Sequence, residues 1–167
     1  MGKDDQGIFT TRYAVVPRTL VFLFHKDKLL LIKGSPQKRI WANKYNALGG
    51  HIEKGEDALA AARRELFEES GLQTSTLYLC GTVLIETGQE KGVLLQVFWG
   101  EYEGGSLINS EEGELEWVNL SEINNYDIVE DLQLMISKIL KTRQTNVPFS
   151  AHYSYDENDH LVIRYSN

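Results

Sequence analysis

Three glutamates with no lysine among them stand close together in the middle of the chain: Glu65, Glu68 and Glu69. Residues of an α-helix advance by about 100° each, so in a helix Glu68 and Glu69 lie about 60° and 40° from Glu65, on opposite sides of it. The three carboxylates then share an arc of roughly 100° and repel one another unless a positive group lies among them. Hard oxygen ligands at this pitch suit Mg²⁺ or Mn²⁺. They suit Zn²⁺ poorly, because the predicted helix contains neither His nor Cys.

The residues around the glutamates carry the signals of a single helix. The pattern predicts a helix from about Asp57 to Ser70, with Gly71 as its C-terminal stop. Leu59, Ala62 and Leu66 form an apolar stripe at helical spacing. The acidic arc therefore borders the buried face of the helix and does not oppose it.

One arginine is placed to hold these carboxylates. Arg64 and Glu68 are an i, i+4 pair, and Glu56 precedes the helix within reach of an arginine. Gly49 and Gly50 lie just before, where the absence of a Cβ lets the chain turn sharply and lets a backbone carbonyl approach a bound ion. An ordinary amphipathic helix with a charged surface is the alternative interpretation of the glutamates alone.

The complete spacing is more specific than the helix alone. From Gly50 the chain runs through five residues, Glu56, seven residues, Arg64-Glu65-Leu66, one residue, Glu68-Glu69, one residue and Gly71-Leu72. This pattern resembles the Nudix box at every defined position. The resemblance implies an α/β fold, namely an α/β/α sandwich with a mixed sheet and two main helices. It also implies an enzyme that uses a divalent metal to cleave a nucleoside diphosphate linked to another group.

The resemblance assigns a role to each residue of the box. The metal ligands that it implies are Glu65, Glu68, Glu69 and the carbonyl of Gly49. Arg64, counted with the catalytic residues Glu65 and Glu68, would form a supporting pair with Glu56, and Gly50 and Gly71 would shape the backbone. A metal on the diphosphate would neutralise the charge that builds on the leaving group and would make water a better nucleophile.

A general base is expected from outside the box. The segment before Trp117 offers four glutamates: Glu111, Glu112, Glu114 and Glu116. Glu112 is the preferred base and a further metal ligand, because MutT-type members place a metal-facing glutamate five or six residues before a tryptophan here. Glu111 is the next choice, and an acidic surface loop is the alternative for any of them.

Features outside the box resemble the subgroup that hydrolyses oxidised purine nucleoside triphosphates. Asn46 matches an asparagine that hydrogen-bonds the purine edge in that subgroup, and Glu130 and Asp131 fall where such proteins present carboxylates to the base. The resemblance implies release of a monophosphate and pyrophosphate from a substrate such as 8-oxo-dGTP. As alternatives, Asn46 is a turn residue, and Glu130 and Asp131 are charges that favour the dipole of a second helix.

Other residues near the box have less specific signals. Lys33 is expected to contact substrate phosphate, with Lys44 as the alternative, although lysines near loops are usually solvated. Trp41 and Tyr45 either stack on a base or close the loop that contains them.

Two other functions compete with this one. The first is hydrolysis of ADP-ribose, a nucleotide sugar or a dinucleoside polyphosphate by the same box. The second is a nucleotide-binding sensor without catalysis, which commonly loses box glutamates, whereas this chain keeps all of them.

Composition limits the remaining classes. The 167 residues, 42% of them hydrophobic, fit one domain over residues 1–167. The net charge of −7 argues against binding of long nucleic acid but not of one nucleotide.

The single cysteine, Cys80, is expected to be a buried apolar residue, and its being alone fits a reducing compartment. No signal peptide or membrane span is recognised, so we expect a cytoplasmic protein that does not bind membranes. A homodimer is common in the family, and nothing in the sequence decides it.

The elements that must position these residues follow from their patterns. We expect strand hairpins over residues 19–33 and 149–167, single strands over 76–87, 93–104 and 114–120, a loop over 34–46 and a second helix over 128–142. The order of elements is not a regular alternation of strand and helix, so a doubly wound fold is not expected.

Overall fold

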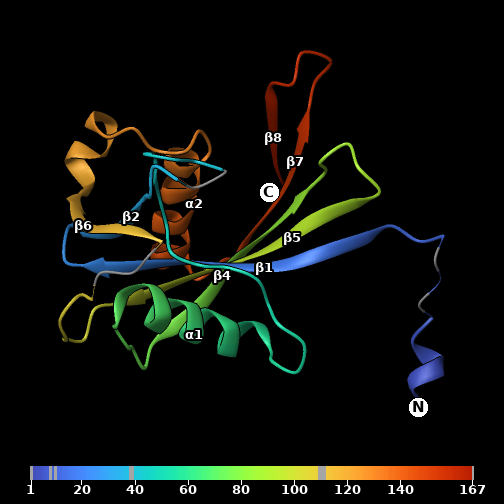
Figure 1. Cartoon of the computed structure of the whole chain (residues 1–167), viewed down its shortest axis with the longest axis horizontal. Helices are drawn as coiled ribbons and strands as arrows, with labels where there is room; N and C mark the ends of the chain where they lie inside the picture. Colours follow the sequence, from blue (N-terminus) through green and yellow to red (C-terminus); the bar gives the residue numbers. More distant parts are fainter. Residues whose placement is uncertain (1, 8, 10, 38–39, 109–111, 167) are drawn as a thin grey trace.

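The computed structural model describes residues 2–7, 9, 11–37, 40–108 and 112–166. Its helices are α1 and α2, with the 3₁₀ helices η1 and η2, and its strands are β1 to β8 (Figure 1). In chain order the elements are η1 (Lys3–Gln6), β1 (Ala14–His25), β2 (Lys28–Gly34), β3 (Tyr45–Asn46), α1 (Ala58–Ser70), β4 (Leu77–Ile85), β5 (Lys91–Glu101), β6 (Gly113–Asn119), η2 (Leu120–Asn125), α2 (Leu132–Thr145), β7 (Phe149–Tyr155) and β8 (Leu161–Ser166).

The strands form a mixed sheet. Seven of them lie in the order β3-β2-β1-β5-β4-β7-β8, and β6 pairs with β2 off this path. The β1–β5 and β4–β7 pairs are parallel, whereas β1–β2, β2–β3, β2–β6, β4–β5 and β7–β8 are antiparallel. The predicted mixed sheet is therefore confirmed, and so are the hairpins β1–β2 and β7–β8.

The sheet separates two hydrophobic cores because the side chains of a central strand alternate between its faces. Val21 and Leu23 of β1 belong to the core that includes Ala62 and Leu66 of α1. Phe22 and Phe24 of β1 belong to the core that includes Met135, Ile136 and Ile139 of α2. One helix thus covers each face, as Figure 1 shows. The predicted α/β/α sandwich with two main helices is confirmed.

Local sequence signals set both ends of α1. Asp57 is the N-cap, and its carboxylate accepts a hydrogen bond of 2.9 Å from the Ala60 amide. Gly71 ends the helix in the left-handed conformation, with φ of 74°, and its amide donates to the Phe67 carbonyl at 2.7 Å. The helix begins and ends as predicted, so the glutamates are presented over its last two turns.

Cys80 lies in the interior of β4. It is fully buried, and its thiol donates to the Val97 carbonyl at 3.3 Å. Burial raises the pKa of the Cys80 thiol to about 12. The thiol is therefore not a nucleophile at neutral pH, in agreement with the expectation of a small buried apolar residue.

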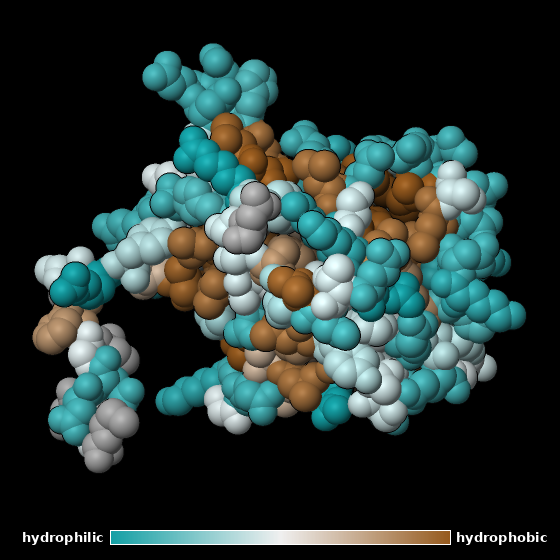
Figure 2. Space-filling model, turned by 180° about the vertical axis from the view of Figure 1, so that it is seen from behind, coloured by the Kyte–Doolittle hydropathy of each residue, from teal (hydrophilic) through white to brown (hydrophobic). Residues whose placement is uncertain are grey.

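Hydrophilic side chains dominate the outer rim and the projecting segments of the face shown in Figure 2, with apolar side chains gathered between them. Among the helices of the described residues, none combines the length and the hydrophobicity needed to span a bilayer.

Candidate active site

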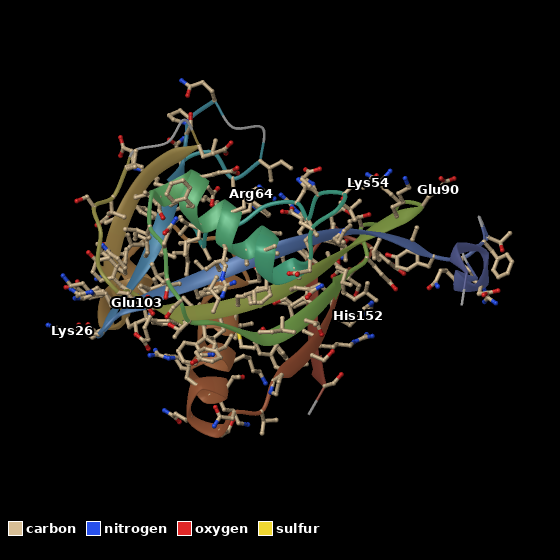
Figure 3. The ribbon with its side chains drawn as sticks, turned by 90° about the horizontal axis from the view of Figure 1, so that it is seen from below. Lys26, Lys54, Arg64, Glu90, Glu103 and His152 are labelled. Carbon is tan, nitrogen blue, oxygen red and sulfur yellow. The ribbon has the colours of Figure 1, made fainter. Side chains whose placement is uncertain are left out.

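Arg64 is the positive group among the glutamates of α1. Its Nη1 donates to Glu65 Oε1 at 2.8 Å and to Glu68 Oε2 at 3.0 Å. Its Nη2 donates to Glu56 Oε1 at 2.7 Å and to the His51 carbonyl at 3.0 Å, and its Nε donates to Glu56 Oε2 at 3.2 Å. Figure 3 shows Arg64 on α1, with Lys54 in the loop that precedes the helix. One guanidinium thus holds two carboxylates of the helix, a third before the helix, and the backbone of the glycine-rich loop.

The ion pairs of Arg64 also set its electrostatics. Hydrogen bonding to Glu56, then to Glu65, raises the pKa of the Arg64 guanidinium. Hydrogen bonding from Arg64, followed by that of the Glu53 amide, lowers the pKa of the Glu56 carboxyl. Both groups therefore remain charged at neutral pH.

The loop before α1 lies directly against the carboxylates. The Gly49 amide donates to Glu69 Oε2 at 2.7 Å, and Glu69 is only 7% exposed. A Cβ at Gly50 would lie 2.4 Å from Glu65 Oε1, so no other residue fits there without displacing that carboxylate. Gly49 has φ of 144°, and a Cβ there would lie 2.3 Å from the Thr19 carbonyl oxygen. Gly50 is thus needed for the loop to approach α1, and Gly49 for the loop to approach β1.

These carboxylates line an acidic cavity of about 370 Å³. The residues that line it are Arg18, Gly49, Gly50, His51, Glu53, Glu65, Glu68, Glu69 and Glu112. Arg18, His51 and Glu53 are not among the residues predicted from the sequence pattern. Glu53 and His51 are close to Gly50 in the chain and could have been included on that ground, whereas Arg18 comes from β1.

The donor set of the acidic cavity fits a hard divalent cation. Carboxylate oxygens predominate, and the Gly49 backbone is adjacent, which is the ligand chemistry of Mg²⁺ and Mn²⁺. Within the part of the chain that the structure describes, no three His, Cys, Asp or Glu side chains converge as a ready-made metal centre. Arg64 donates to Glu65 and Glu68, and the Gly49 amide donates to Glu69, so these hydrogen bonds orient the carboxylates that are expected to hold the metal.

A second cavity, of about 670 Å³, adjoins the first and has the size of a small-molecule site. We call it the base cavity, and its lining includes the predicted residues Asn46, Glu130 and Asp131. Trp41, 49% exposed, also lines it, whereas Tyr45 does not. Three residues line both cavities, namely Arg18, Gly49 and Glu69.

Backbone pairing brings the separated parts of the base cavity together. The Tyr45 amide donates to the Asp127 carbonyl at 2.8 Å, and the Val129 amide donates to the Tyr45 carbonyl at 3.0 Å. The segment before α2 is thereby fixed beside β3, which places Asn46 near Glu130 and Asp131. The Asn46 Oδ1 atom accepts a hydrogen bond of 2.8 Å from the Ala47 amide, which orients its side chain in the cavity wall.

Asp131 has an unusual environment in the base cavity. Burial raises the pKa of the Asp131 carboxyl, and hydrogen bonding from its own backbone amide, then from the Tyr153 hydroxyl, opposes this rise in part. Tyr153 is itself almost fully buried, and its hydroxyl lies 3.3 Å from that of Tyr165. Asp131 is also the N-cap residue of α2, but its side chain makes no capping hydrogen bond. Its carboxylate thus faces the base cavity and does not cap the helix.

This environment predicts that Asp131→Asn stabilises the protein. A carboxyl whose pKa is raised by folding favours the folded state only while protonated, so the ionised form destabilises it as pH rises through the folded pKa. We expect a higher Tm for Asp131→Asn than for the wild type at pH 7, with a difference that shrinks toward zero as pH is lowered to about 4. The exposed neighbour substitution Asp127→Asn is the matched control. A wild type that is more stable than Asp131→Asn at pH 7 would show that the ionised carboxylate is favourably held.

The structure does not bring every predicted residue to the cavities. Lys33 lines neither of them, and its Nζ lies 5.8 Å from the centroid of the Tyr45 ring. The reason is strand alternation, because the adjacent residue Ile32 lines the base cavity. Lys44, the alternative lysine, does line the base cavity.

Of the four glutamates proposed as the base, Glu112 lines the acidic cavity. Glu116 accepts hydrogen bonds from the hydroxyls of Tyr45, at 2.7 Å, and Tyr126, at 2.9 Å, and lines neither cavity. Hydrogen bonding to Glu116 contributes to the raised pKa of Tyr45, about 12, after burial, its largest cause. Glu114 lines neither cavity, and Glu111 lies outside the described residues.

Comparison with known protein families identifies the family of this chain. A family model described as NUDIX domain matches residues 15–138, which is more than half of the chain. The chain belongs to the Nudix family. The expected enzyme class, a Nudix hydrolase, is thereby confirmed.

Relatives of this Nudix hydrolase include the oxidized purine nucleoside triphosphate hydrolase of Mus musculus, 28% identical over 149 residues that cover 89% of this chain and 91% of the relative. Among solved structures, the MutT protein from Bacillus halodurans is similar with a TM-score of 0.76 and 21% identity, covering 91% of this chain and 98% of that chain. The NUDIX domain of Shewanella oneidensis NrtR, complexed with ADP ribose, has a TM-score of 0.65 and 13% identity, covering 86% and 99%. These structural similarities show the shared Nudix fold.

Proposed function

We propose that this Nudix hydrolase cleaves oxidised purine nucleoside triphosphates, such as 8-oxo-dGTP, to the monophosphate and pyrophosphate with Mg²⁺ or Mn²⁺. The observation that carries the proposal is the continuity of two cavities of different chemistry, one acidic and one with amide and carboxylate groups on a partly apolar wall. A nucleotide also has two chemically different parts: the phosphates, which a metal in the acidic cavity would bind, and the base, which fits the base cavity. The similarity to the mouse enzyme that acts on oxidised purine triphosphates supports this assignment.

The base cavity carries groups that match a guanine edge. The amide of Asn46 offers both a donor and an acceptor, and the carboxylates of Glu130 and Asp131 accept from N–H groups of a base. Trp41 offers an aromatic face at the cavity wall. A site whose hydrogen-bonding groups are satisfied by one base edge discriminates against bases that leave them unpaired.

The residues that would hold the metal are Glu65, Glu68, Glu69 and Glu112, with the Gly49 carbonyl. When bound, the metal would neutralise charge on the triphosphate and acidify water. Arg64 and Glu56 keep the carboxylates oriented, as their hydrogen bonds indicate.

In the proposed reaction, water attacks one of the two phosphorus atoms that the α,β-bridging oxygen joins. A bond forms between the water oxygen and phosphorus, the bond from that phosphorus to the α,β-bridging oxygen breaks, and pyrophosphate and the monophosphate separate. The Glu112 carboxylate is the proposed general base, which accepts a proton from the water, because it lines the acidic cavity and comes from outside α1. The bridging oxygen leaves as part of a phosphate group and needs no protonation by a protein acid.

A nucleotide panel tests the proposed function. We expect kcat/KM for 8-oxo-dGTP to exceed that for dGTP, ADP-ribose and a nucleotide sugar in Mg²⁺, with pyrophosphate as the product. Asn46→Ala is expected to lower the preference for 8-oxo-dGTP over dGTP by about tenfold to hundredfold, since hydrogen bonds to the base edge are lost. Asn124→Ala, an exposed asparagine outside both cavities, is the control.

Other outcomes of the panel would replace the proposal. Fastest turnover of ADP-ribose or a nucleotide sugar would leave the acidic cavity as the catalytic site and remove the base-reading roles. Binding of nucleotides without turnover of any of them would make the protein a sensor.

A further inference from the structure

Arg18 on β1 stands at the junction of the two cavities. Of the three residues that line both, Gly49 has no side chain and Glu69 is an anion, so Arg18 is the cation of the junction. Arg18 is also the single Lys or Arg among the residues of the described chain that line the acidic cavity, against five glutamates. A molecule that occupies both cavities therefore lies beside a residue that lines each of them.

The position of Arg18 is set by the glycine-rich loop. The Thr19 amide donates to the Gly50 carbonyl at 2.8 Å, the Ile52 amide donates to the Pro17 carbonyl at 3.1 Å, and an isolated antiparallel bridge joins Arg18 to His51. The backbone of Arg18 is thereby tied to the same loop that contacts the catalytic carboxylates. Because side chains alternate along a strand, Arg18 lies on the face of β1 that also carries Leu20, a base-cavity residue.

The Arg18 side chain makes no hydrogen bond or ion pair that involves the described residues, although five carboxylates line the adjoining cavity. Arg64, in contrast, binds three of the glutamates around α1. Arg18 is therefore not a second brace for the carboxylates. A half-buried guanidinium at the border of an acidic cavity, with its donors uncommitted, is suited to a phosphate, which it binds with two parallel hydrogen bonds.

We propose that Arg18 binds the α-phosphate of the nucleotide, the phosphate nearest to the nucleoside. The assignment rests on the proposed function, in which the base occupies the base cavity and the remaining phosphates occupy the acidic one. The α-phosphate is the group that then lies between them. Arg18 positions the triphosphate beside the carboxylates of the acidic cavity and does not exchange a proton.

Product binding isolates this contact from turnover. We would measure the affinities of 8-oxo-dGMP and of 8-oxodeoxyguanosine by calorimetry in EDTA, with the wild type, Arg18→Gln and Arg18→Lys. We expect Arg18→Gln to weaken 8-oxo-dGMP binding by about tenfold to hundredfold and to leave nucleoside binding unchanged. Arg18→Lys should recover part of the loss, because it restores the charge but not the paired geometry. The control is Arg63→Gln, an exposed arginine of α1 outside both cavities.

Two results would overturn the assignment: monophosphate affinity that stays within twofold of the wild type, or an equal loss for nucleoside and monophosphate. If the wild type binds AMP and adenosine instead of the 8-oxo compounds, the proposed function fails, and the same comparison with AMP and adenosine then decides the role of Arg18. Thermal unfolding of each variant identifies any that fail to fold, in which case Arg18→Lys carries the comparison.

Discussion

Glu69→Gln is expected to lower kcat/KM by about 10³-fold at fixed Mg²⁺, because the substitution removes one charge from the predicted metal ligands at the junction of the two cavities. Glu69 is 7% exposed and accepts a hydrogen bond from the Gly49 amide. Glutamine has nearly the same shape and keeps an oxygen that can accept this bond. We therefore expect the folded structure to be preserved. The Tm should be unchanged or higher, since a neutral amide replaces an ionised carboxylate that is buried.

The matched control for Glu69→Gln is Glu90→Gln. Glu90 lies at the turn between β4 and β5, well apart from Arg64 and α1 (Figure 3), and is exposed. The Glu90→Gln substitution should leave kcat/KM unchanged. Activity of Glu69→Gln within tenfold of the wild type, at the same Mg²⁺ concentration, would exclude Glu69 from the metal site.

Arg64→Gln has the second largest expected effect, because several interactions depend on one guanidinium. We expect kcat/KM to fall by about 10²-fold, in the range typical for groups that orient metal ligands. Three carboxylates, those of Glu56, Glu65 and Glu68, would lose their common partner. The free energy of unfolding should also fall, by about 1–2 kcal/mol, a value kept small because these pairs are partly exposed to solvent.

The Mg²⁺ dependence separates orientation of the carboxylates from general destabilisation. If Arg64 positions metal ligands, the Mg²⁺ concentration for half-maximal rate rises in Arg64→Gln even at temperatures where the variant is fully folded. Arg64→Lys should be intermediate, because an ammonium cannot bind the acceptors of α1 and those of the preceding loop together as a guanidinium does. Unchanged Mg²⁺ dependence and Tm in Arg64→Gln would contradict the bracing role.

The parts of this protein that were predictable from sequence are those fixed by local chemistry. The bounds of α1 follow from the cap at Asp57 and the stop at Gly71, and both are formed by neighbouring backbone groups. The sheet strands were recognisable because β1 and β2 are continuous apolar runs buried on both faces. The spacing of the glutamates then located the acidic cavity without knowledge of the tertiary structure.

The placements that sequence could not give concern residues whose environment depends on strand register. Lys33 is one residue away from the base cavity wall, and a shift of one residue along a strand reverses the face. Arg18 carries no local signal at all, since its place at the junction arises from pairing with the loop at His51. The contact between Tyr153 and Asp131 joins β7 to the start of α2, a pairing that no short-range pattern contains.

The most direct test of the proposed activity is a competition in a single reaction. Equal concentrations of 8-oxo-dGTP, dGTP and ADP-ribose are incubated with the enzyme and Mg²⁺, and the nucleotides and products are separated and quantified over time, with Glu69→Gln and an EDTA-treated sample in parallel. We predict that 8-oxo-dGTP disappears first, with equal amounts of 8-oxo-dGMP and pyrophosphate, and that both parallel samples are nearly inactive. Consumption of ADP-ribose before 8-oxo-dGTP, or equal consumption of dGTP and 8-oxo-dGTP, would contradict the proposed substrate class.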